Sequence, residues 1–445
     1  MLPAAATATE QAETVPHSTE TAPAWSLTTR LFFRFGVIYF ALYVLTTQML
    51  SSLVLLPSGE LPQIAATKRA IAIFSWVAGH VMGITSGFVT GETGSGDRTL
   101  DWAQTIALVA VAVLGTIVWS LATRRRAHPT VQKWFAVFLR FALGATMLTY
   151  GFAKVFPLQM PPPSLQRLLE PYGSFSPMGV LWYSVGASPA YEIFVGSAEA
   201  LGGVLLMIPP LATLGALITL ADVTEIFVLN MTYDVPVKLF SFQLILMSLF
   251  LLAPEMRRLA SVIIMNRPTG PSPQRPLFRG RTATRVAVTV QLVCALYIVS
   301  LNVYGGWDAL RSRRAATSPL YGIWDVTDLS NDGQPRPPLL TDASRWRRVI
   351  FPPQATAMSV QLMNDTFAGF ICAIDTGAKT VKLEKGADRN WKATFAYDRP
   401  DADTMSIDGT MDGHRVQAKL HRVDHTKFML LSRGFHWIQE APFNR

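Results

Sequence analysis

Seven apolar runs, each about 20 residues long, restrict what the first 305 residues of this chain can form. They begin near Leu31, Trp102, Trp134, Pro189, Leu211, Lys238 and Val286. A helix of about 20 residues crosses the hydrocarbon core of a bilayer, which is about 30 Å thick. The runs therefore predict an α-helical membrane bundle. An eighth run, residues 70–84, is shorter and contains His80, so it either crosses the membrane or lies at its interface, and the predicted number of spans is seven or eight.

The composition supports a membrane-embedded chain. Half of the 445 residues are apolar and only 16% are charged, whereas about 25% of the residues of a soluble domain are charged. The formal net charge of +9 arises around the helices, where arginines cluster at residues 124–126 and 257–285. No stacking aromatic residues alternate with these arginines, which argues against nucleic acid as a partner.

The basic loops also predict an orientation. Arginine and lysine concentrate in the cytoplasmic loops of membrane proteins, and residues 254–285 contain seven arginines against Glu255 alone. Counting spans backward places residues 124–126 on the same side, and counting forward places everything after Gly305 on the other side. Arg311, Arg313 and Arg314 argue weakly for the opposite orientation. We therefore expect a multi-pass protein of the bacterial cytoplasmic (inner) membrane, with its last part outside the cytoplasm.

Four carboxylates lie inside the predicted spans, where an ionised group costs roughly 2.5 to 3.5 kcal/mol on insertion scales. Glu192 and Glu199 are seven residues apart on one helix, and Asp222 and Glu225 are three apart on the next, so each pair shares a helix face. At a rise of about 1.5 Å per residue, Glu199 and Asp222 fall near the middle of the bilayer. Such residues either pair internally or carry a proton and merely fix the helix register, or they line a polar cavity that binds a ligand or relays protons.

Cations are expected only toward the outer side, as Lys154, Lys238 and Arg167. Lys154 and Lys238 lie with Asp97 and Asp234 on outer loops or helix ends, which the predicted topology brings to one face. This outer cluster and the deeper carboxylates would then form one outward-opening polar path.

Signatures of a bound metal or redox centre are missing from the sequence. Cys294 lies in a helix and Cys372 in the later β region, so we do not expect a disulfide. The chain has no CxxC motif, no CxxCH motif and no cluster of histidine and cysteine, so haem, iron–sulfur and zinc sites have no support. A quinone remains a candidate ligand.

The last part of the chain reads as short alternating strands from Tyr321 onward, at 346–351, 358–363, 367–374, 380–385, 391–397, 404–407, 415–420 and 428–432. Eight or nine such strands predict a small, lipocalin-like all-β barrel. Gly322-Ile323-Trp324 and Arg433 resemble the Trp and Arg pair that closes the end of such barrels. A small barrel either holds one ligand or is filled by its own side chains, and we favour a filled barrel that caps the membrane bundle. Tyr172 of the outer loop and His436, Trp437 and Arg445 are candidate contacts between barrel and bundle; the alternative for the last three is a strand that ends with a salt bridge.

Several separated motifs, in order, resemble the DoxX-like family of bacterial membrane proteins. They are Tyr150-Gly151-Phe152-Ala153-Lys154, Pro171-Tyr172-Gly173, Ser176-Pro177-Met178-Gly179, Gly202-Gly203 after Glu199, and Tyr233-Asp234-Val235-Pro236-Val237-Lys238. Gly94-Ser95-Gly96-Asp97 and the closing Arg433-Gly434-Phe435-His436-Trp437-Ile438 resemble an uncharacterised subgroup of that family. The resemblance implies a four-helix membrane module. The family name is attached to quinone-linked sulfur oxidation and terminal oxidases in some relatives, but it supplies no agreed catalytic residue to carry over.

We expect six segments: a disordered tail that is not a cleaved signal (1–28), N-terminal membrane helices (29–126), the DoxX-like module (127–256), a basic cytoplasmic loop (257–285), a last transmembrane helix (286–306) and the β domain (317–445). No catalytic constellation indicates an enzyme, and an acyl or phosphoryl transferase lacks its nucleophile or phosphate loop. The function we favour is binding or moving a small or lipid-like ligand. The alternative is a quinone-linked redox component, such as a thiosulfate-quinone oxidoreductase-like protein.

Overall fold

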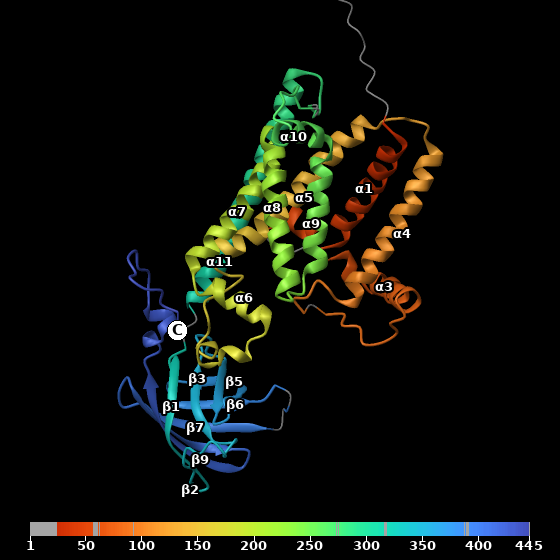
Figure 1. Ribbon diagram of the computed structural model, residues 1–445. Helices are drawn as coiled ribbons and strands as arrows, with labels where there is room; N and C mark the ends of the chain where they lie inside the picture. The colour runs from red at the N-terminus through yellow and green to blue at the C-terminus, as the bar shows by residue number, and fades with distance from the viewer. Residues whose placement is uncertain are drawn as a thin grey trace, which may run out of the picture.

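The computed structural model describes residues 25–56, 61, 63–91, 93–272, 274, 276–315, 318–386, 388 and 391–444. It consists of a helical bundle with a β-barrel at one end (Figure 1). The predicted N-terminal tail lies outside these residues up to position 24, as does the predicted contact residue Arg445.

Within the described residues, seven helices are long and apolar enough to cross a membrane, which confirms the predicted bundle and a multi-pass membrane protein. They are α1 (Leu27–Thr46), α4 (Thr99–Ala122), α5 (Pro129–Val155), α7 (Pro189–Met207), α8 (Ala212–Thr232), α9 (Lys238–Leu252) and α11 (Arg281–Ala315). Helix α9 continues through a short 3-10 turn (Ala253–Glu255) into α10 (Met256–Ile263). Helix α11 is longer at both ends than the predicted span 286–306, so Arg311 and Arg313 lie on the helix, beyond that predicted span.

The eighth apolar run forms the short helix α3 (Lys68–Val81), which follows α2 (Met49–Leu53). Its 14 residues rise only about 21 Å, too little to cross the bilayer core. Phe74 and Val77 of α3 pack against Leu100 and Ala103 of α4, and the helix lies across one end of the bundle (Figure 1). The interfacial alternative therefore fits this segment.

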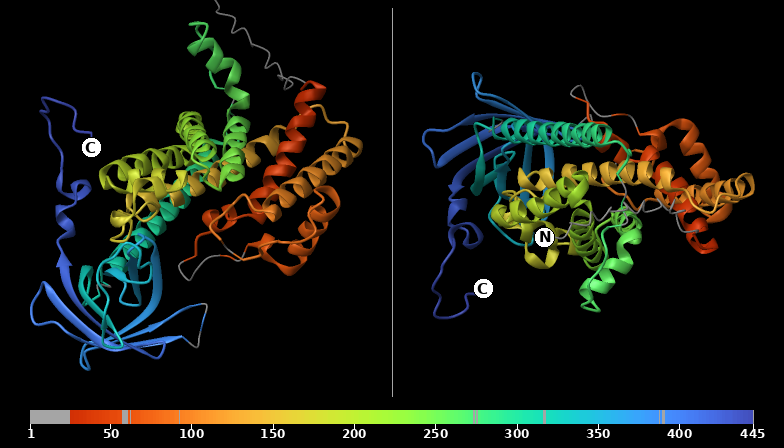
Figure 2. Two further views of the ribbon diagram at one scale, coloured as in Figure 1. Left: turned by 60° about the horizontal axis from the view of Figure 1, so that its bottom comes forward. Right: turned by 90° about the horizontal axis from the view of Figure 1, so that it is seen from above.

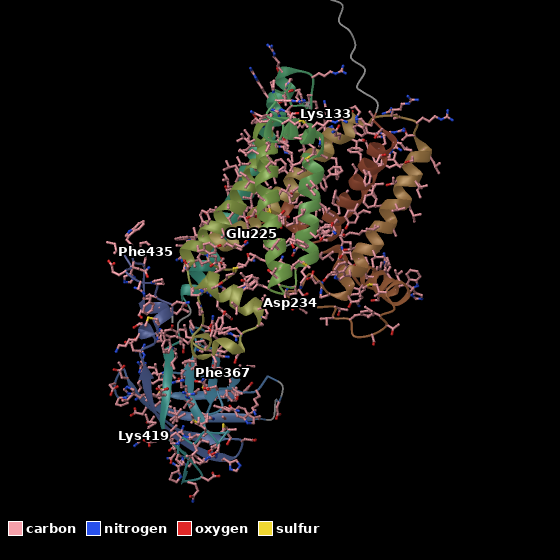
Figure 3. All side chains as sticks on the ribbon, in the orientation of Figure 1. Lys133, Glu225, Asp234, Phe367, Lys419 and Phe435 are labelled. Carbon is pink, nitrogen blue, oxygen red and sulfur yellow. The ribbon has the colours of Figure 1, made fainter. Side chains whose placement is uncertain are left out.

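The connections between spans alternate between two ends of the bundle. Residues 123–128 and the described residues within 253–280 lie at one end, which we call the basic end because the described arginines of both clusters lie there; Lys133 is labelled there in Figure 3. The described residues within 47–98, together with residues 156–188 and 233–237, lie at the other end, which we call the barrel end because the barrel follows α11 there (Figure 1). The chain thus brings both arginine clusters to one end, as the span count predicts.

Helices α5 and α7 approach each other closely at two pairs of glycines. A Cβ on Gly144 would lie 2.8 Å from the carbonyl oxygen of Gly203, and a Cβ on Gly151 would lie 2.8 Å from the carbonyl oxygen of Gly196. Only glycine leaves room for backbones this close, which is how small residues favour helix association in membranes. This contact fixes the two helices that carry the candidate site.

The barrel consists of β1 (Gly322–Asn331), β3 (Trp346–Phe351), β4 (Ala357–Leu362), β5 (Phe367–Asp375), β6 (Thr380–Glu384), β7 (Lys392–Asp398), β8 (Thr404–Met411) and β9 (His414–Val423), with the short strand β2 (Gln334–Pro335) paired to β1. All pairings are antiparallel and follow chain order, and β1 pairs with both β3 and β9, which closes the barrel. Trp324, Trp346 and Phe395 belong to the buried cluster that fills its interior. The predicted small, filled barrel is confirmed.

Two details of the predicted barrel are wrong. The residue that stacks on Trp324 is Arg399, whose Cζ lies 5.3 Å from the indole ring, whereas Arg433 lies beyond the barrel and donates to His436. The predicted strand 428–432 is instead the short helix α12 (Met429–Ser432), after a 3-10 turn (His425–Lys427). Strand β9 already closes the barrel on β1, so no open edge is left for a further strand.

A loop at the barrel end links the two parts. Leu165 packs against Ile323 and Ile350 of the barrel, and the Arg313 guanidinium of α11 donates to the Pro157 carbonyl (3.2 Å). The loop then forms α6 (Pro177–Gly186) before α7 begins. The barrel is therefore held by contacts with the bundle as well as by the chain that joins them.

Candidate functional site

The centre of the candidate site is a buried ion pair between α5 and α7. Lys154 lies in the last turn of α5, and its Nζ donates a hydrogen bond to Oε1 of Glu199. The Lys154 side chain is 7% exposed and the Glu199 side chain is fully buried. The close approach at Gly151 and Gly196 brings the base of Lys154 against α7. The close packing of α5 against α7 therefore holds the buried Lys154–Glu199 salt bridge in place.

This pair corrects the expectation that no cation lies at the depth of Glu199. Counting residues along a helix gives the depth of Cα atoms, and Lys154 is indeed near the helix end. Its flexible four-carbon stem lets the ammonium group lie well away from its own Cα. In the structure it extends inward to Glu199 instead of outward to water.

Carboxylate oxygens outnumber donors around this pair. Oε2 of Glu199 and Oδ2 of Asp222 are buried and lack a hydrogen-bond partner among the described residues. Asp222 interacts electrostatically with Glu199, Lys154 and Glu225. Glu225 itself is exposed on the surface of the bundle (Figure 3). We call Lys154, Glu199, Asp222 and Glu225 the intramembrane cluster. In it, one ammonium group pairs with Glu199 and interacts electrostatically with the other two carboxylates.

Glu192 has a different role. It is fully buried, and its Oε1 accepts a hydrogen bond from the Met160 backbone N–H (2.8 Å). This contact fastens the loop at the barrel end to the first turn of α7. Its Oε2 has no hydrogen-bond partner within the described part of the chain. Glu192 and Glu199 thus share a face of α7, as predicted. Glu192, however, binds the backbone of the loop and not another charged side chain.

The outer cluster contains Asp97, Asp234 and Lys238, without Lys154. Asp97 accepts hydrogen bonds from the backbone N–H groups of Lys238 (3.0 Å) and Leu239 (2.9 Å), so it caps the start of α9. The Lys238 Nζ lies 2.9 Å from Asp234 Oδ1 and 3.7 Å from Asp97 Oδ2. These bonds tie the segment before α4 to the turn between α8 and α9, and they account for most of the polar atoms of the cluster.

Two buried arginines were missed by the sequence analysis, which considered only carboxylates inside the spans. Arg34 of α1 donates to Ser120 (2.8 Å) and to His128 (3.0 Å) at the basic end. Burial and then the charge of Arg34 lower the pKa of His128, which favours the neutral imidazole that can accept the hydrogen bond. Arg140 of α5 donates to the Leu206 carbonyl (2.7 Å) near the end of α7. A scan of the apolar runs for every charged residue would have found both.

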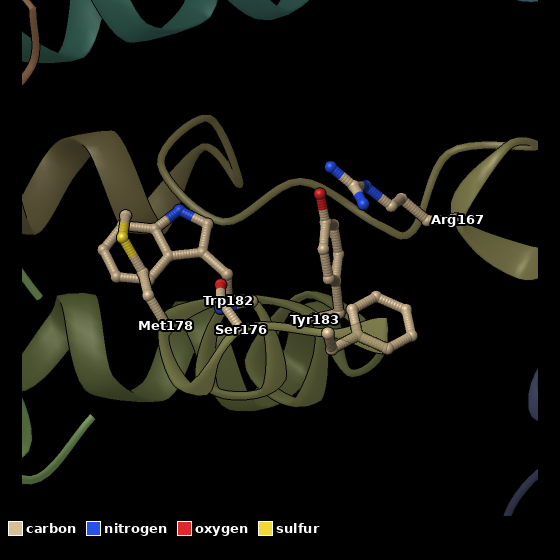
Figure 4. A pocket seen from close by; sticks show the side chains of 7 residues that line it. Arg167, Ser176, Met178, Trp182 and Tyr183 are labelled. Atoms are coloured by element: carbon tan, nitrogen blue, oxygen red, sulfur yellow. The ribbon is translucent and has the colours of Figure 1, made fainter. Parts of the chain in front are cut away.

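A cavity of about 180 Å³ lies at the loop of the barrel end (Figure 4), lined by Arg167, Phe175, Ser176, Met178, Gly179, Trp182 and Tyr183. Arg167 was predicted as a partner for the intramembrane carboxylates. It pairs instead with Glu170, and its Cζ lies 5.5 Å from the Tyr183 ring. This cavity is separate from the intramembrane cluster.

Three of the four predicted contact residues, Tyr172, His436 and Trp437, lie on the surface of the described structure. Tyr172 and Trp437 are exposed (75% and 90%), and His436 is exposed beside Arg433. Contact between the two parts of the molecule comes instead from Leu165, Ile323 and Ile350. No group of three or more histidine, cysteine, aspartate or glutamate side chains in the described residues could hold a metal ion.

These features define a class: a multi-pass membrane protein whose helical bundle contains a buried, acid-rich ion cluster and carries a filled β-barrel at one end. No protein-family model matches the chain, and no solved structure matches it. The chain is 31% identical over 146 residues to the uncharacterized protein YwoB of Bacillus subtilis (strain 168), an alignment that covers 31% of this chain and 87% of YwoB. The chain belongs to the family of YwoB.

Proposed function

We propose that the bundle binds a small ligand at the intramembrane cluster and moves it through a polar path that opens toward the barrel end. The observation that carries this proposal is the pair of buried oxygens without donors, Glu199 Oε2 and Asp222 Oδ2, beside an ion pair that has only one cation. An unsatisfied buried acceptor costs about 1 to 3 kcal/mol. A ligand that supplies hydrogen-bond donors or positive charge offsets this cost.

The chemistry of the cluster selects the kind of ligand. Its acceptor oxygens fit a protonated amine, a hydroxyl-bearing lipid-like molecule or protons themselves, because each supplies donors to carboxylates. The exposed position of Glu225 offers an entry from the side of the bundle. A free anion is disfavoured, since it would meet three carboxylates.

A quinol is the second candidate. Its two hydroxyl groups are donors of the kind that Glu199 and Asp222 lack, and the DoxX-like resemblance points to quinone-linked membrane chemistry. In this alternative the cluster would hold the quinol head group between α7 and α8. No redox partner is needed for the binding step that we propose here.

Native mass spectrometry of the protein purified in lipid nanodiscs tests both candidates. We expect a co-purifying small molecule on the wild type and its loss in Glu199→Gln. Glu255→Gln is the matched control, because Glu255 is a buried, paired glutamate at the basic end, far along the chain from the cluster. A molecule identified as a quinol would favour the second candidate, and an identical bound population in both variants would refute the site.

We also propose that the protein lies in the bacterial cytoplasmic membrane with the barrel outside the cytoplasm. What supports this is the gathering of the arginine clusters at the basic end. In intact cells, an impermeant thiol reagent should label Lys419→Cys on the barrel and leave Gly270→Cys at the basic end unlabelled. The reverse pattern would invert the orientation.

A further inference from the structure

The segment 428–444 leaves the barrel and runs back beside the bundle. After β9 and α12 it extends away from the barrel toward the level of the spanning helices, standing apart from them in every view (Figures 1 and 2). We call it the aromatic segment, because Phe435, Trp437 and Phe443 lie in it.

The aromatic segment turns its apolar side chains outward. Trp437 is 90% exposed, Ile438 81% and Phe435 76%. Other large apolar side chains of the segment are also exposed, namely Met429, Leu430, Leu431 and Phe443. Soluble proteins rarely expose a contiguous apolar patch of this kind unless it contacts a partner or a membrane.

Internal contacts give the segment a compact shape without burying that apolar surface. The rings of Phe435 and Trp437 pack edge to face at 5.0 Å. Arg433 donates to His436 (2.5 Å), and its Cζ lies 4.8 Å from the Phe443 ring. The polar groups are thus used within the segment, whereas the side chains of Phe435, Trp437 and Ile438 stay exposed.

The position of the segment identifies its partner. In Figure 3, Phe435 lies at a height between Glu225, which is within α8, and Asp234, which follows α8 at the barrel end. Its exposed surface is therefore level with the last turns of a membrane-spanning helix. Tryptophan is enriched at the boundary between acyl chains and head groups, and segments that lie in this boundary combine tryptophan, phenylalanine and leucine with arginine or lysine.

We propose that the aromatic segment inserts into the membrane leaflet at the barrel end, with phospholipid as its partner. Insertion would cover Phe435, Trp437 and Ile438 with lipid. It would also attach the barrel to the bilayer at a second point in addition to α11, and so limit how far the barrel can tilt. This inference does not depend on the ligand proposed for the intramembrane cluster.

Fluorescence quenching in the full chain tests the insertion. The protein, with Cys294→Ser and Cys372→Ala, is placed in phosphatidylcholine nanodiscs and labelled with an environment-sensitive fluorophore at Ile438→Cys. Lys419→Cys on the barrel, whose side chain is 76% exposed, is the matched control. Nitroxide-bearing lipids should quench the label at position 438 and not at 419, whereas aqueous iodide should quench position 419 several-fold more strongly.

The outcomes separate the possible partners. Equal iodide quenching at both sites would mean that the segment stays in water, and protection from both quenchers would mean that protein, such as a second copy of the chain, covers it; either result overturns the proposal. As a second variant, Phe435→Ser with Trp437→Ser should lower the lipid quenching at position 438. Leu340→Ser on the barrel, which removes an equally exposed apolar side chain, should leave it unchanged.

Discussion

Substituting Lys154 should destabilise the bundle more than substituting its partner Glu199. Removing one partner of a buried ion pair costs about 3 to 5 kcal/mol, because the other charge stays buried without compensation. Lys154→Met should reach that range, since it leaves three carboxylates without their cation while keeping most of the side-chain volume. Glu199→Gln should cost less, about 1 to 3 kcal/mol, because Asp222 can still partner the ammonium group.

The double variant decides whether the pair acts as a unit. Residues in one ionic network show coupling energies of about 0.5 to 3 kcal/mol, so Lys154→Met with Glu199→Gln should cost less than the sum of the single changes. Lys133→Met serves as the control, because Lys133 is half-buried at the basic end, where its Nζ donates to the Pro276 carbonyl (2.7 Å). The assay is loss of helical circular dichroism as SDS replaces a mild detergent. Additivity within about 0.5 kcal/mol would refute the pairing.

The same measurement separates structure from function at Glu199. If the carboxylate serves only packing, then any loss of ligand binding in Glu199→Gln should track the loss of folded protein. If it binds the ligand, binding should fall in the fraction that remains folded. A lowered midpoint with a proportionate loss of bound ligand would therefore contradict the proposed function.

Three further predictions test other parts of the molecule. Gly151→Val should force α5 and α7 apart and lower the unfolding midpoint, whereas Gly305→Ala, where a Cβ meets no neighbour within 4 Å, should raise helix stability by up to about 1 kcal/mol. Burial raises the pKa of the Cys372 thiol to about 11, so iodoacetamide at pH 7.5 should alkylate it only after the barrel unfolds; mass spectrometry reports the adduct. Trp324→Ala should destabilise the barrel by about 3 to 5 kcal/mol, measured by protease resistance, with Leu340→Ala nearly neutral.

The sequence predicts the number of spans and the barrel because both depend on local patterns. Insertion into a bilayer is governed by apolar content over about 20 residues, and strand alternation follows from side chains pointing to opposite faces. The helix α3 shows where this reasoning stops, since its run is apolar and only the length of the helix separates it from the spanning helices. The apolar pattern also did not predict that Arg311 lies on α11, because the helix continues past the end of the apolar run.

Partners of individual side chains could not be read from local patterns. Lys154 meets Glu199 because two glycine pairs set the spacing of α5 and α7 and because the lysine stem extends inward. Arg399 stacks on Trp324, in place of Arg433, because the partner depends on which loop passes the end of the closed barrel. Both contacts depend on how the folded elements pack in three dimensions. The spacing of residues along the chain therefore cannot predict them.

The intramembrane cluster and the barrel are joined by a continuous series of contacts. Glu199 and Glu192 lie on one face of α7, and Glu192 holds the backbone of Met160 at the start of the loop. Five residues further on, Leu165 of that loop packs between Ile323 and Ile350 of the barrel. A shift of α7 that accompanies a change at Glu199 would therefore act on the loop and, through it, on the barrel.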